Sequence, residues 1–134
     1  MPERYAFYNG PDLIGISALE HGDPSMGIRM GHFSPKKGYA SIEPLYRELS
    51  LVSFEESQAV SEPDRHLALK ARREQLQQQT AALALTVQTS EGKSVPTAWV
   101  DIVDFSAEIG DHERQVTICV DDHLTYTAFF PEPL

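Results

Sequence analysis

Three predicted turns, at residues 20–23, 111–113 and 121–123, each combine a histidine with carboxylates. Imidazole and carboxylate side chains hold divalent metals and exchange protons near neutral pH. None of these turns has the spacing of an established metal motif such as H-E-x-x-H. Because Asp and Gly are also common in turns of purely structural role, ordinary turns are the favoured interpretation. The candidate residues for a metal or acid–base site are His21, Asp23, His32 and His123.

The sequence contains no motif of an established catalytic centre. The glycines at residues 10–15 and 27–31 form neither a phosphate-binding loop nor a dinucleotide-binding fingerprint. The single cysteine, Cys119, lies in a predicted strand, where we expect a buried thiol. We therefore expect no catalytic residues and no cofactor. A small metal-dependent or acid–base enzyme that uses the four candidates above is the alternative.

The chain is strongly acidic, with 20 acidic and 11 basic residues among 134 and a net charge of −9. The excess is concentrated in residues 86–134, which carry nine acidic residues and two basic ones. Such a surface repels phosphate backbones and anionic membranes, so neither nucleic acid nor a membrane is an expected partner. The one basic stretch, within residues 65–73, has no interleaved aromatic residues that would suit nucleic acid.

Acidic surfaces steer association with basic proteins, and this is the leading functional hypothesis. The sequence indicates a small protein-binding module, of the inhibitor or immunity type, that masks a basic partner. A small-ligand domain with a pocket over the face of Gly27 and Gly31 is a further alternative. The predicted contact residues are acidic, with one aromatic anchor: Asp101, Asp104, Glu108, Asp111, Asp121, Asp122 and Tyr126.

Turn signals and alternating apolar residues predict three strands at the start of the chain, over residues 5–8, 13–20 and 26–33. A helical stripe follows over residues 42–54, and good helix formers predict a second helix over residues 65–79. The sequence does not decide where this second helix ends. Leucines spaced by seven residues suit a longer helix, whereas the alternation of apolar and polar residues after residue 81 suits a strand.

Four more strands are predicted after the helices, over residues 82–89, 96–105, 114–120 and 124–130. The predicted strand at residues 96–105 is apolar on both faces and is therefore expected in the centre of a sheet. The last one is an expected edge through which two copies could associate. The order β-β-β-α-α-β-β-β-β predicts one α+β domain over residues 1–134, a curved, mainly antiparallel sheet with two helices on one face.

The stretches IGISALE, DPSMG and GHFSP, within residues 14–35, resemble a family of small bacterial proteins of unknown function. The resemblance implies a bacterial, cytoplasmic protein and no mechanism. The start of the chain lacks the apolar run of a signal peptide, and no stretch has the ~18 apolar residues of a membrane span. A cytoplasmic location is the expectation.

Overall fold

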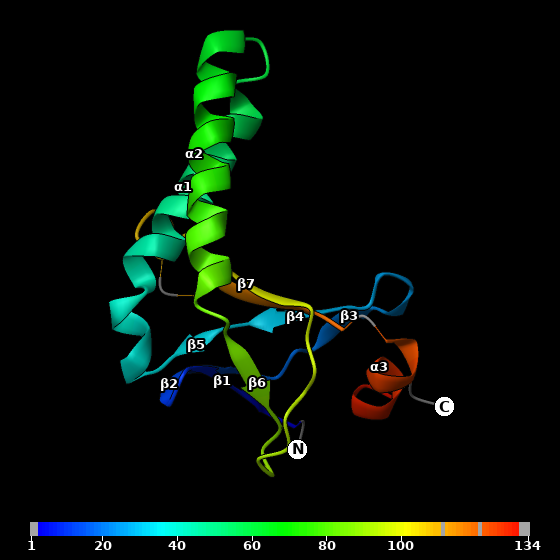
Figure 1. Cartoon of the computed structure of the whole chain (residues 1–134). Coiled ribbons are helices and arrows are strands. Elements are labelled where there is room, and N and C mark those ends of the chain that lie inside the picture. The colour runs from blue at the N-terminus through cyan, green and yellow to red at the C-terminus, as the bar shows by residue number, and fades with distance from the viewer. Residues whose placement is uncertain (1–2, 111, 121, 132–134) are drawn as a thin grey trace.

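The computed structural model describes residues 3–110, 112–120 and 122–131. It contains two four-stranded antiparallel sheets, and a pair of helices that stands away from them (Figure 1). The predicted α+β class is confirmed, with the strands divided between two sheets. No helix in the described residues is both long and apolar enough to cross a membrane.

The first sheet has the order β5-β2-β1-β6 and begins with the hairpin predicted around Gly10. Gly10 adopts a φ of 59°, which glycine reaches without steric cost. The second sheet has the order β3-β4-β8-β7. The strands are β1 (Tyr5–Asn9), β2 (Asp12–Ser17), β3 (His21–Asp23), β4 (Ile28–His32), β5 (Ser34–Pro35), β6 (Thr86–Gln88), β7 (Trp99–Asp104) and β8 (Arg114–Cys119).

One hydrophobic core joins the two sheets. Phe33 lies at its centre, with its ring 6.0 Å from that of Phe7 and 5.2 Å from that of Tyr39, both edge-on. Val87 from the first sheet and Ile118 from the second are buried in the same cluster. The tyrosine belongs to the short 3-10 turn Lys37–Ser41, which leads from β5 into the first long helix.

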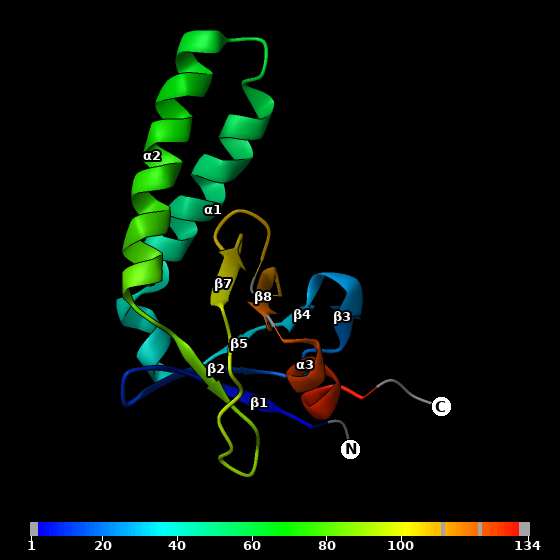
Figure 2. The same ribbon diagram turned by 45° about the vertical axis from the view of Figure 1, so that its right-hand side comes forward.

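Helix α1 (Glu43–Gln58) and helix α2 (Pro63–Ala82) form an antiparallel hairpin that extends beyond the sheets (Figure 2). The base of α1 lies against β7, whereas α2 packs mainly on α1. Leu76 is the one buried residue of α2. Ion pairs between the helices supplement this thin apolar contact, as between Arg72 and Glu48 at 2.7 Å.

Helix α2 ends at a left-handed residue that no sequence signal marks. Ala84 has a φ of 51°, a conformation that glycine usually supplies after a helix. We expect Ala84→Gly to raise the free energy of unfolding by roughly 0.5–1 kcal/mol, because the left-handed conformation costs an L-residue about 1–2 kcal/mol. Chemical denaturation measures the effect.

The matched control is Ala81→Gly, inside the same helix. It should lower stability by about 1 kcal/mol, as glycine does in helix interiors. Equal destabilisation by both substitutions would contradict the capping role of residue 84.

The last predicted strand is wrong, because residues 123–129 form helix α3 (His123–Phe129). Asp122 caps this helix by accepting a hydrogen bond from the Leu124 N–H at 3.1 Å. Tyr126 is buried and its hydroxyl donates to the Ile28 carbonyl at 3.1 Å. Capping and burial together override the strand preference of these residues, so the edge expected to support self-association does not exist.

Two further predictions are corrected. The turn expected at residues 20–23 contains strand β3, and a 3-10 turn (Pro24–Met26) that Asp23 caps follows it. Residues 96–105 do not form a central strand, since β7 lies at the edge of the second sheet. Trp99 at its start is 46% exposed. Ile102 belongs to the core and Val100 packs against it, whereas Val103 lies beside α1 in a groove. Strand β7 is apolar on both faces although it is an edge strand, because α1 packs against it.

Candidate functional site

A groove of about 260 Å³ runs between α1 and the edge strand β7. Helix α1 contributes Phe54 and β7 contributes Asp101, while Phe105 follows β7 directly. The rings of Phe54 and Phe105 are 6.3 Å apart and nearly perpendicular. The other lining residues are mostly small or apolar: Leu49, Ser50, Ser53, Ile102 and Val103. The groove thus has apolar walls and a single carboxylate.

Asp101 is half-buried, and no cationic side chain within the described residues forms an ion pair with it. Burial raises the pKa of this carboxyl group, although a hydrogen bond from the Ile102 backbone partly opposes the effect. The nearby Tyr46 hydroxyl is fully buried and has no hydrogen-bond partner in the described chain. Burial and the charge of Asp101 raise the pKa of that hydroxyl. The groove therefore lacks a cation among the described residues.

Asp101→Asn should stabilise the free protein at neutral pH. The folded-state pKa lies above the unfolded one, so this group favours folding below the unfolded pKa and loses that contribution as the pH rises through the folded pKa. Each unit of pKa elevation corresponds to roughly 1.4 kcal/mol at neutral pH. Urea unfolding of the wild type and the variant at pH ~7 measures the gain.

The stability difference between the wild type and Asp101→Asn should disappear at pH ~3, where the aspartate is protonated and both side chains are uncharged. Glu91→Gln, in the exposed turn after β6, is the matched control and should leave stability unchanged. Destabilisation by Asp101→Asn at neutral pH would contradict an uncompensated charge in the groove.

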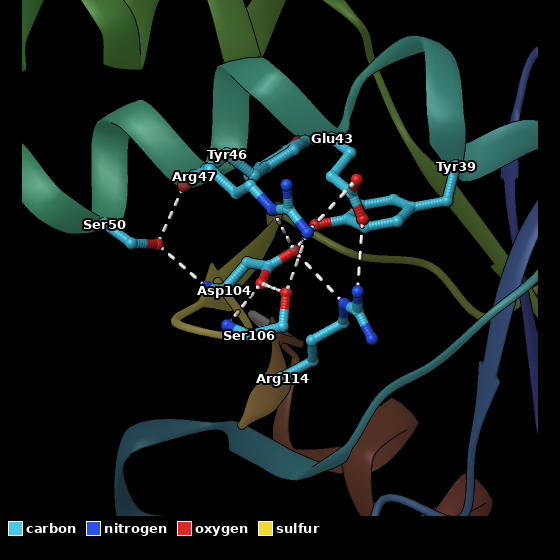
Figure 3. Close-up of polar contacts among 8 residues, drawn as sticks. All are labelled: Tyr39, Glu43, Tyr46, Arg47, Ser50, Asp104, Ser106 and Arg114. Carbon is cyan, nitrogen blue, oxygen red and sulfur yellow. Dashed lines mark hydrogen bonds and ion pairs between the residues drawn. The ribbon is translucent and has the colours of Figure 1, made fainter. Parts of the chain in front are cut away.

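Asp104, three residues further along β7, has a different environment (Figure 3). It is fully buried, and its carboxylate accepts hydrogen bonds from the Tyr39 hydroxyl at 2.7 Å and the Ser106 hydroxyl at 2.6 Å. Nε of Arg114 donates to it at 3.2 Å. The backbone N–H of Asp104 donates to the Ser50 hydroxyl of α1 at 2.8 Å. These bonds attach α1 to the second sheet.

Glu43 completes this cluster at the start of α1. One carboxylate oxygen pairs with Arg47 at 3.3 Å and the other with Arg114 at 3.2 Å. Arg47 also lies 3.9 Å from the Asp104 carboxylate. The charges of two arginines and two carboxylates thus cancel within the cluster. Charged groups that are removed from water need such compensation.

The predicted contact residues do not form one surface. Asp104 and Tyr126 are buried, which corrects their assignment to a partner-binding surface. Asp122 caps α3 at the opposite end of the second sheet from Glu108, whose loop follows β7. Asp101 is the one that lines a groove. Two more of the predicted residues, Asp111 and Asp121, lie outside the described residues.

The four predicted metal or acid–base residues are also separated. His21 and His32 line one cleft of about 470 Å³ on the second sheet, together with His112. Asp23 instead caps the 3-10 turn, by accepting from the Ser25 N–H. His123 lines a different hollow beside Gly27. Across the described residues, no three metal-ligating side chains already converge.

Gly27 and Gly31 do not share a strand face, because Gly31 lies in β4 whereas Gly27 precedes the strand with a left-handed φ of 68°. A Cβ on Gly31 would lie 2.4 Å from the Glu20 carboxylate and 2.8 Å from the Ser17 hydroxyl. A Cβ on Gly27 would lie 2.4 Å from the Val120 carbonyl oxygen. The glycines therefore allow neighbouring groups to pack where a Cβ would stand. Each still borders open space, since Gly31 lines the cleft with His32 and Gly27 lines the hollow with His123.

The sequence prediction missed the aromatic walls of the groove, Phe54 and Phe105, and the buried Tyr46. The apolar residues of α1 form only a generic helical stripe, and the partner strand of that helix is not visible in the sequence. No known protein family, curated protein or solved structure matches the chain. The resemblance of residues 14–35 to a bacterial family stays an expectation.

Proposed function

We propose that this protein is a non-catalytic binding module that takes a lysine or arginine side chain of a basic partner protein into the groove between α1 and β7. The observation that carries the proposal is Asp101, a half-buried carboxylate with no cationic partner in the described chain. Removing a charge from water is costly unless an opposite charge accompanies it. A cationic side chain from a partner supplies that charge.

The walls of the groove suit the remainder of such a side chain. Lysine and arginine have aliphatic stems that pack on apolar surface while the charged end reaches a polar group. Phe54, which is 53% exposed, and Phe105 offer ring faces and edges beside the carboxylate. Cations also interact favourably with aromatic faces. A space of about 260 Å³ accommodates one long side chain, since a liquid water molecule takes ~30 Å³.

The surroundings of the groove favour a protein over a free amine. The loop after β7 presents Ile109, 69% exposed, and the exposed acidic Glu108. These two side chains would give a basic protein an apolar contact and an attractive charge next to the groove. The net charge of −9 accelerates encounter with a basic partner. The module acts as an inhibitor of the immunity type if the captured basic residue belongs to the working surface of that partner.

Selection of binders from a random peptide display library on the wild-type protein tests this function. We expect the selected peptides to share a lysine or arginine, and to bind Asp101→Asn at least tenfold more weakly than the wild type. Glu91→Gln should bind them as the wild type does. Selected peptides without a basic residue, or binding that ignores residue 101, would contradict the proposal.

A further inference from the structure

The cleft on the second sheet brings together histidines that are far apart in the sequence. His32 ends β4, and His112 precedes β8, which pairs with β4. Their ring centroids are 6.3 Å apart, with the rings inclined at 45°. Both side chains are exposed, and His21 lines the same cleft.

We propose that His32 and His112 bind one divalent transition metal ion of the Zn²⁺ class in this cleft. Imidazole nitrogen suits zinc, copper and nickel, whereas Mg²⁺ and Ca²⁺ prefer oxygen ligands. Metal-bound histidines have Zn–N distances of about 2.0–2.1 Å, which places the centroids of two tetrahedrally arranged rings about 5 Å apart. The observed separation exceeds this by about 1 Å, a shift within the rotamer freedom of exposed side chains.

The cleft holds further side chains of ligand type around the two imidazoles. Glu20 is engaged, because its carboxylate accepts a hydrogen bond from the His32 N–H at 3.2 Å. Glu113 is exposed beside His112, and His21 lies on the neighbouring strand β3. No three potential ligands converge within the described residues, so water completes the coordination around the two imidazoles. This cleft shares Val103 and Phe105 with the groove at Asp101, but neither proposed histidine ligand lines that groove.

Equilibrium dialysis of the full chain against Zn²⁺ tests the site. We expect one ion per chain at micromolar free metal, and at least tenfold weaker binding for His32→Ala and for His112→Ala. His66→Ala, at the far end of the helical hairpin, should bind as the wild type does. Mg²⁺ should not compete.

Imidazole ¹⁵N shifts provide a second readout that does not depend on variants. Zn²⁺ should move the resonances of His32 and His112 and leave that of His66 unchanged. The absence of stoichiometric Zn²⁺ binding would overturn the proposal. Binding that survives both substitutions, or that is lost equally in His66→Ala, would overturn it as well.

Discussion

Asp104→Ala should lower the free energy of unfolding by about 3–5 kcal/mol, because it removes a buried counter-charge from a network of ion pairs. Arg114 and Arg47 both pair with Glu43 as well, and that single carboxylate would then face two cations. The Tyr39 hydroxyl would lose its acceptor inside the core. Urea unfolding followed by circular dichroism measures the loss.

The conservative variant Asp104→Asn keeps the shape of the side chain and removes its charge. It should lose less free energy of unfolding than Asp104→Ala. It can therefore still be measured if the alanine variant does not fold. Glu108→Ala, an exposed acid in the following loop, is the matched control and should change stability by less than about 0.5 kcal/mol. If Asp104→Asn unfolded at the same urea concentration as the wild type, the result would contradict a structural role for this carboxylate.

The same carboxylate should contribute to acid unfolding. Burial by itself would raise the pKa of Asp104, but hydrogen bonds from Ser106 and Tyr39 and the charge of Arg114 outweigh it and hold the pKa below its usual value. Its contribution to stability is therefore complete above the unfolded pKa of about 3.9 and is lost as the pH falls through the lower folded pKa. Asp104→Asn should flatten the stability profile in that acidic range.

Reversing the charge in the groove should have the largest effect on binding. Asp101→Lys is expected to weaken basic peptides selected on the wild type by at least a hundredfold, since it replaces an attraction with a like-charge contact in a poorly solvated groove. Titration calorimetry measures the change. The wild-type affinity should also fall with added salt, because the contact is charged.

Glu91→Lys is the control for this experiment, since it changes the net charge equally at an exposed turn. It should weaken binding only slightly, and mainly at low salt. Equal losses in Asp101→Lys and Glu91→Lys would mean that net charge, and not the groove, attracts the peptide.

The contrast between Asp101 and Asp104 shows what the sequence allows. Both lie in an apolar strand, three residues apart, so the alternation of side chains places them on opposite faces. The sequence pattern is therefore sufficient to predict different surroundings for the two carboxylates. It is not sufficient to predict that Asp104 meets Arg114 of β8 while Asp101 lines an apolar groove, because strand register and helix placement depend on long-range packing.

The end of the helical hairpin and the end of the chain show the limits of local patterns. The α+β class followed from the turn signals and the change of period. The end of α2 did not, because an alanine at residue 84 carries no termination signal. Helix α3 was missed partly because Tyr126 anchors it to β4, through a hydrogen bond from its hydroxyl to a residue almost a hundred positions earlier.

His112 illustrates the same limit for the histidine cleft. It stands in a turn that the sequence indicates as a possible source of ligands, but it is not among the four candidate residues. Its proximity to His32 follows from the pairing of β4 with β8, in which His32 lies opposite Gln115. Sequence spacing alone gives no access to this pairing.

A crystal structure of the protein with one selected basic peptide tests the central proposal most directly. We predict a lysine or arginine nitrogen within about 3 Å of an Asp101 carboxylate oxygen, the distance of a charge-assisted hydrogen bond. The aliphatic stem should lie against Phe54 and Phe105. A peptide bound elsewhere, or an apolar side chain in the groove with Asp101 uncontacted, would contradict the proposed function.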